Sequence, residues 1–130
     1  MEQFELLSDP KKIYSKMIKD IRGAKSKIYL ETYQFDKDIV GKKFRDELTK
    51  KASQGIKVAV LVDSWGSSVD KDFFKNLIFK KAKVRFFREI KYVTRIISKN
   101  HERNHRKLLL IDDNISYVGS RNITASGMNW

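Results

Sequence analysis

The residues best suited to chemistry in this chain form one spaced pattern near its end, H-x-K-x4-D-x6-G-S-x-N. Its six positions are His105, Lys107, Asp112, Gly119, Ser120 and Asn122. A neutral imidazole is a competent nucleophile toward a phosphodiester, and a covalent phospho-histidine divides one difficult displacement into two easier steps. The pattern therefore predicts phosphodiester chemistry, with His105 as the nucleophile.

The other members of the pattern suit the binding of a phosphoryl group. Side chains repeat every two residues along a strand, so Lys107 shares a face with His105 and places a positive charge near the phosphoryl oxygens. Ser120 and Asn122 are also two residues apart and can donate hydrogen bonds to the same oxygens. Gly119 would let the backbone approach the phosphate closely. Ordinary turn chemistry is the alternative interpretation of Ser120 and Asn122.

Three acidic residues have open roles. Asp112 could be a catalytic acid, but it lies an odd number of residues from His105, so a structural role at a hairpin turn is favoured. Glu31 either lines the site as a supporting acid that orients a histidine, or is an exposed charge at a sheet edge. Asp63 ends an apolar stretch, where α/β folds place ligand sites, although it also suits a turn that leads into a helix.

Both histidines of the chain lie in the stretch His101-Glu102-Arg103-Asn104-His105, which matches the zinc motif HExxH. A zinc site of that kind needs a third protein ligand downstream. No His or Glu follows His105, and Asp112 and Asp113 are too near. The sequence therefore predicts no metal site and no cofactor, with His101 as a solvated loop residue.

Helices and strands alternate in the expected secondary structure. Asp9-Pro10 begins a helix that ends near Gly23, and a second helix around residues 40–52 ends before Gly55. A third helix contains residues 73–78. Strands are expected at 27–35, 56–62, 84–87, 107–111 and 115–118, the last two joined as a hairpin. Residues 28, 30 and 32 should share one face, and 56–62 should be an interior strand covered on both faces. This order predicts an α/β fold with a mixed, largely parallel sheet flanked by helices.

Length and charge limit the classes of protein that fit. The 130 residues make one domain, 1–130, and 28 Lys and Arg against 16 Asp and Glu give a net charge of +12. The expected partner is anionic, either a nucleic acid or an anionic lipid surface. The chain has no cysteine, so thiol nucleophiles and disulfide scaffolds are excluded. No apolar run approaches the ~20 residues of a membrane span, and no secretory signal is visible, so we expect a cytoplasmic or peripheral membrane protein.

The pattern at 105–122 resembles the HKD motif of the phospholipase D superfamily. The resemblance extends to YLETYQF, KKASQGIKVAVLVD and RNHRKLLLID, which are similar to the amino-terminal half of bacterial cardiolipin-synthase-like members. It implies that this domain is one phospholipase D-like half with a single HKD motif, truncated after residue 130. Because family members bring two motifs together, it also implies a homodimer or a second HKD half, in which one histidine attacks and the other serves as acid and base.

Two functions are compatible with these observations. The favoured one is a phospholipase D-type phosphodiesterase or phosphatidyltransferase that acts on phospholipid through a phospho-histidine, similar to a cardiolipin synthase. The alternative is a metal-independent endonuclease that works as a homodimer on nucleic acid. The basic segment 90–100 alternates cations with apolar residues. It is either a surface loop that touches headgroups or a nucleic-acid backbone, or a buried ribbon with solvated cations.

Overall fold

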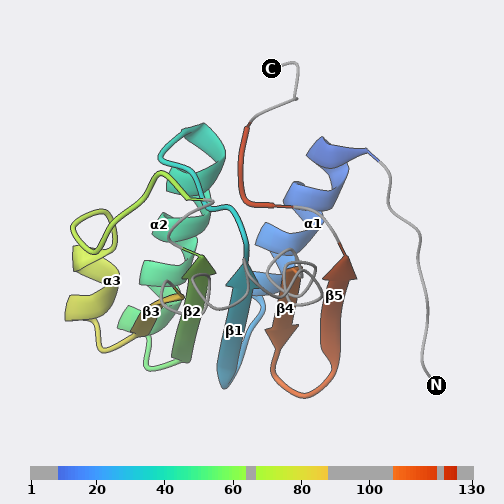
Figure 1. Ribbon diagram of the computed structural model, residues 1–130. Helices are drawn as coiled ribbons and strands as arrows, with labels where there is room; N and C mark the ends of the chain where they lie inside the picture. Colours follow the sequence, from blue (N-terminus) through green and yellow to red (C-terminus); the bar gives the residue numbers. More distant parts are fainter. Residues whose placement is uncertain (1–8, 64–66, 88–106, 120–121, 126–130) are drawn as a thin grey trace, which may run out of the picture.

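A computed structural model describes residues 9–63, 67–87, 107–119 and 122–125, and these build a sheet with helices packed against it (Figure 1). The described elements follow one another as α1 (Pro10–Arg22), β1 (Lys27–Thr32), α2 (Ile39–Ser53), β2 (Lys57–Asp63), α3 (Lys75–Phe79), β3 (Lys83–Phe87), β4 (Lys107–Ile111) and β5 (Ile115–Gly119). Helices and strands therefore alternate as expected, and the expected hairpin of the last two strands is present.

The five strands form one sheet in the order β3-β2-β1-β4-β5. β1, β2 and β3 pair in parallel, whereas β4 runs antiparallel to both β1 and β5. The predicted α/β class and mixed sheet are confirmed. Two of the four strand pairings are parallel and two are antiparallel. The parallel pairings belong to the unit β1-α2-β2-α3-β3, and the hairpin of β4 and β5 adds the two antiparallel pairings.

The three described helices cover one face of the sheet, because β1-α2-β2 and β2-α3-β3 are successive crossovers of one hand and α1 packs beside α2. Burial along β1 alternates accordingly, with Ile28, Leu30 and Thr32 buried as predicted. The expectation that residues 56–62 are covered on both faces is wrong for the described structure. Ala59 and Leu61 are only half-buried, since they point away from the helices.

Local sequence signals set the helix ends. The Asp9 side chain accepts a hydrogen bond from the Lys11 N–H at 3.0 Å, and Pro10 occupies the first turn, where its missing N–H costs nothing. Asp38 begins α2 in the same way, accepting from the Gly41 N–H at 2.9 Å. A Cβ on Gly41 would lie 1.7 Å from the Asp36 carbonyl oxygen, so the chain can pass this closely only at a glycine.

Two boundaries differ from the expectation. β1 ends at Thr32 rather than at residue 35, and Phe35 instead forms a parallel bridge with Ile123. α3 begins at Lys75, so Phe73 and Phe74 precede it and pack edge to face against Phe35 in the core. A tertiary contact decides the first boundary, because the backbone hydrogen bonds of Gln34 and Asp36, on either side of Phe35, are made with Ile123, a distant residue in the sequence.

Candidate functional site

Three of the predicted site residues that the structure describes, Lys107, Gly119 and Asn122, lie where β1 ends, β4 begins and β5 ends. Lys107, the first residue of β4, is the register partner of Gly119, the last residue of β5. Glu31 pairs with Leu108, so one further step brings Thr32 to the level of Lys107. His105 and Ser120 lie outside the described residues. The antiparallel hairpin therefore joins two parts of the motif that are twelve residues apart in the sequence.

Lys107 is a buried cation at the start of β4. It is 7% exposed and lies on the helix-facing side of β4, together with Leu109 and Ile111. Burial lowers its pKa below the ordinary value for lysine, because water no longer solvates the ammonium. Its Nζ lies 5.5 Å from the centre of the Tyr33 ring. Among the described residues, no carboxylate approaches it within 4.0 Å. An anion placed here would offset the cost of burying the charge.

The Asn122 side chain is held by the end of β1. Its Oδ1 accepts hydrogen bonds from the Gln34 backbone N–H at 3.1 Å and from the Thr32 hydroxyl at 3.5 Å. Its Nδ2 donates to Gln34 Oε1 at 3.4 Å. Asn122 is therefore oriented by residues of another strand, and the interpretation of Asn122 as an ordinary turn residue does not account for these contacts.

Residues 122–125 pass between the start of α1 and the start of α2 (Figure 1). Ile123 exchanges backbone hydrogen bonds with Gln34 and Asp36 at 2.9 Å. The Tyr14 hydroxyl donates to the carbonyls of Asn122 and Thr124. The segment that carries Asn122 is thus fixed from the sheet side and from the helix side.

A ring of polar side chains completes this support. The Thr124 hydroxyl donates to Asp36 Oδ2 at 2.7 Å, and the Gln34 amide donates to the same oxygen at 2.6 Å. The Ala125 N–H donates to Asp38 Oδ2 at 2.8 Å. The sequence analysis missed these positioning residues and Tyr14. The polar residues Gln34, Asp36 and Asp38 near the end of a predicted strand were a usable signal, whereas Tyr14, 108 residues before Asn122, offered none.

Asp112 lies at the opposite end of β4 from Lys107. Its carboxylate accepts hydrogen bonds from the backbone N–H groups of Lys25, Ser26 and Lys27 and from the Ser26 hydroxyl, at 2.8–3.3 Å. These donors, that of Lys27 first, hold its pKa well below the ordinary range. Asp112 adopts a φ of 53°, in the left-handed region that Asp tolerates in turns. Its contacts are those of the structural role at the turn.

Of the two interpretations of Glu31, the exposed charge at a sheet edge is wrong, and the acid that orients a histidine involves residues outside the described part of the chain. β1 is the middle strand of five, so Glu31 is not an edge charge. Side chains alternate along β1, and Glu31 points to the opposite face from Thr32 and Lys107. There it accepts a hydrogen bond from the Tyr29 hydroxyl at 2.6 Å. Burial, with this hydrogen bond second, raises the pKa of Tyr29 to about 12.

Of the other features that the sequence singled out, only Asp63 lies in the described part of the chain. Asp63 is buried at the end of β2, opposite Phe87 of β3. The HExxH stretch and the basic segment 90–100 lie outside the described residues. In the described part of the chain, no three His, Asp or Glu side chains gather closely enough to share a metal ion. No helix in that part is both long and apolar enough to cross a bilayer.

The arrangement of the sheet is that of a known structural class. NucT from Helicobacter pylori superposes with a TM-score of 0.59 at 18% sequence identity, covering 88% of this chain and 69% of that protein. This likeness concerns the fold, which is that of phospholipase D-like domains.

Sequence comparison narrows the class to a family. The family described as "Cardiolipin synthase, PLD-like domain" matches residues 17–130, and this chain belongs to it. The chain is 38% identical to a cardiolipin synthase of Clostridium perfringens over 123 residues, which is 92% of this chain and 25% of that protein. It is also 38% identical to the major cardiolipin synthase ClsA of Bacillus subtilis over 120 residues, again 92% and 25%. Cardiolipin synthase B of Salmonella typhimurium is 33% identical over 128 residues, 98% and 31%. The predicted resemblance is confirmed, and the chain spans about a quarter to a third of these relatives.

Proposed function

We propose that this domain is one half of a phosphatidyltransferase that moves a phosphatidyl group between alcohols, as a cardiolipin synthase does. The observation that carries the proposal is the buried Lys107 at the level of Thr32, whose hydroxyl holds the oriented Asn122, in a chain of the cardiolipin synthase family. A buried cation without a described carboxylate partner suits a ligand that brings its own negative charge. The phosphodiester of a glycerophospholipid is such a ligand.

The reaction proceeds in two displacements. A nitrogen of the neutral His105 imidazole attacks phosphorus, forming a P–N bond as the P–O bond to the leaving alcohol breaks, and that alcohol takes a proton from a general acid. An acceptor alcohol then attacks phosphorus and gives its proton to the same group, now a base. The P–N bond breaks and His105 is regenerated. Water as acceptor would give hydrolysis instead.

The described residues act on charge and orientation in this scheme. Lys107 offsets the negative charge that builds up on the non-bridging oxygens, and it acts most strongly because burial excludes water. The Asn122 amide donates a hydrogen bond to the same phosphoryl group, from an orientation that Gln34 and Thr32 maintain. Gly119 leaves room for the phosphate beside Lys107, since no described atom lies within 4 Å of a Cβ built on it. Asp112 keeps a structural role.

The general acid must come from outside this motif. A second histidine of the same kind, in a second HKD half or in another copy of this chain, supplies it in the proposal. A C2 homodimer would bring the two sites together with the same surface on both protomers. The enzyme would meet its lipid substrate through peripheral contact with a membrane.

The test offers two substrates to the same preparation. Phosphatidylglycerol vesicles and single-stranded DNA are supplied side by side in EDTA, with light scattering to give the oligomeric state. We expect lipid turnover without metal that His105→Ala abolishes and the matched variant His101→Ala leaves nearly intact. Preferential cleavage of DNA, which the net charge of +12 would also serve, would replace the proposal by the endonuclease alternative. Equal loss from both variants, or activity restored only by a divalent ion, would contradict the mechanism.

A further inference from the structure

A groove of about 410 Å³ runs between α1 and α2, and the proposed function makes no use of it. Its apolar lining includes Ile18, Val40 and Phe44, and Ile39 at the start of α2 is 66% exposed beside it. The α1 residues along it extend from Lys11 to Arg22, about 16 Å at the rise of an α-helix. The volume lies in the range of small-molecule sites, and the shape suits an extended apolar chain.

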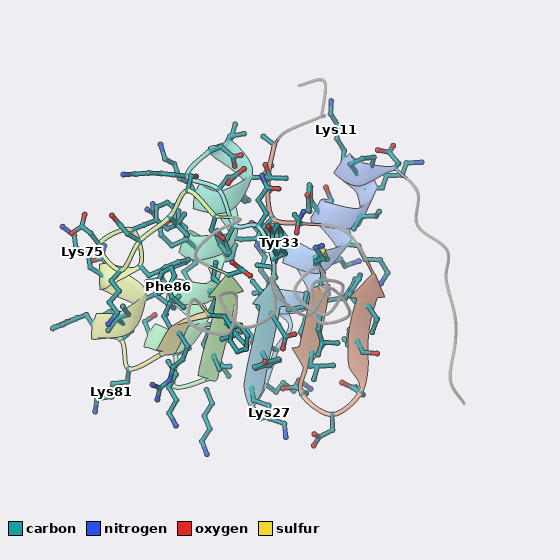
Figure 2. All side chains as sticks on the ribbon, viewed as in Figure 1. Lys11, Lys27, Tyr33, Lys75, Lys81 and Phe86 are labelled. Carbon is teal, nitrogen blue, oxygen red and sulfur yellow. The ribbon has the colours of Figure 1, made fainter. Side chains whose placement is uncertain are left out.

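Two cations, Arg22 and Lys43, lie together at one end of this groove. Arg22 and Lys43 both pair with Glu47, at 2.7 Å and 3.9 Å. The Glu47 side chain is 6% exposed, whereas the side chains of Arg22 and Lys43 are 54% and 57% exposed. Two exposed cations therefore share one buried carboxylate, and this end keeps a net positive charge that faces solvent. The side chain of Lys11, which is labelled in Figure 2, adds a cation at the other end of the groove.

The walls of the groove suit a lipid chain better than a peptide. Both walls are α-helices, whose N–H and C=O groups are paired within each helix and are not available to another backbone. The hydroxyl of Tyr14, a buried lining residue, already donates to the carbonyls of Asn122 and Thr124. An extended peptide would lose backbone hydrogen bonds to water here, whereas an acyl chain loses none.

We propose that the groove between α1 and α2 binds one acyl chain of an anionic phospholipid, with the headgroup phosphate at Arg22 and Lys43 and the chain extending toward Ile39. The site is separate from the motif of residues 105–122 and does not rest on the proposed function. Its occupation would hold the helix layer against an anionic lipid surface, because charge attraction and apolar burial add together there.

The test measures binding of lysophosphatidylglycerol below its critical micelle concentration to the full chain, by calorimetry. We expect binding that is about tenfold weaker in Ser15→Trp, because Ser15 is an exposed lining residue and the indole would fill the groove. Lys43→Gln should weaken binding several-fold. Its matched control is Lys42→Gln, which removes the same charge one residue away, outside the lining, and should bind like the parent chain.

The results that would contradict this proposal can be distinguished from one another. Equal weakening by Lys42→Gln and Lys43→Gln, or equal affinity for lysophosphatidylcholine, would show unspecific charge attraction and overturn the proposal. Binding unchanged in a Ser15→Trp protein that melts like the parent would also overturn it. A fall in molecular mass caused by Ser15→Trp would identify a second copy of the chain as the occupant instead. Binding measured in a His105→Ala background separates this site from turnover, so either proposal can fail alone.

Discussion

The two ends of β4 differ in how fully their charged groups are satisfied. At one end, the Asp112 carboxylate accepts hydrogen bonds from three backbone N–H groups and one hydroxyl. At the other end, Lys107 is buried beside the Tyr33 ring, with a lowered pKa and no described carboxylate within ion-pair range. In Figure 2 the labelled Tyr33 and Lys27 mark these two ends of β1, the neighbouring strand.

We therefore expect Asp112 to matter mainly for stability and Lys107 mainly for activity, although both lie at the ends of one strand of five residues. At the turn end, the Asp112 carboxylate stabilises the fold, because its hydrogen bonds join the end of β4 to the start of β1. At the other end, burial of the Lys107 charge costs stability, as expected for a residue that is retained to bind a ligand. Substitutions at the two ends should therefore have opposite consequences for activity and for unfolding.

The largest effect is expected from Lys107→Met. Loss of the charge toward the phosphoryl oxygens should lower turnover by about 10²–10³-fold. The melting temperature should stay the same or rise, because a buried cation is replaced by an apolar side chain of similar length. Phosphatidylglycerol turnover and thermal unfolding measure the two effects. Lys27→Met, at the exposed start of β1, is the control and should retain turnover. A similar loss in both variants would remove the functional distinction between the ends.

Gly119→Ala tests whether the space beside Lys107 is used by the ligand. A Cβ there meets no described atom within 4 Å, so stability should be unchanged, whereas turnover should fall on the order of tenfold if the phosphate approaches this backbone. Gly41→Ala is the contrasting glycine. Its Cβ would lie 1.7 Å from a carbonyl oxygen, and about 1–3 kcal/mol of stability should be lost. Full activity in a folded Gly119→Ala protein would contradict the assigned phosphate position.

Asp112→Asn should lower the free energy of unfolding at pH 7. The pKa of Asp112 is lowered in the folded protein, first by the Lys27 N–H, so its contribution is complete above the ordinary value of 3.8 and is lost as pH falls below it. The difference between the parent and the variant should therefore narrow as pH falls below 3.8. Denaturant titrations between pH 7 and pH 3 measure this trend.

Asp113→Asn is the matched control for that experiment. The Asp113 side chain is 88% exposed and pairs with Lys27 in solvent, so its loss should change stability little. Turnover at pH 7 should survive in folded Asp112→Asn protein. A selective loss of turnover without loss of stability would instead give Asp112 a catalytic role.

The smallest expected effect comes from Tyr14→Phe. Its hydroxyl holds the carbonyls of Asn122 and Thr124 from α1, and losing these bonds should cost about 1 kcal/mol of stability. Because Asn122 is still held by Gln34 and Thr32, turnover should fall only a few-fold, through a higher KM. A fall in kcat as large as that of Lys107→Met would mean that the support of Asn122 is part of the chemistry.

Periodic patterns and short motifs were sufficient to predict the order of helices and strands and the family of the chain. Alternation along residues 27–32 predicted which side chains face the helices, and Asp9-Pro10 predicted the start of α1. The spacing from His105 to Asn122 indicated phosphodiester chemistry and the family. These signals can be recognised in the sequence because strand and helix periods repeat within a few residues and a motif has fixed spacing.

Only the tertiary structure decided how the site is held. The antiparallel placement of β4 beside β1 puts Glu31 on the face away from Lys107, although both are charged residues in strands. Pairing of Ile123 with Gln34 and Asp36 ends β1 early and orients Asn122. These contacts join residues that are far apart in the sequence, such as Glu31 and Leu108 or Gln34 and Ile123, and their register depends on the packing of the whole sheet, which no local pattern contains.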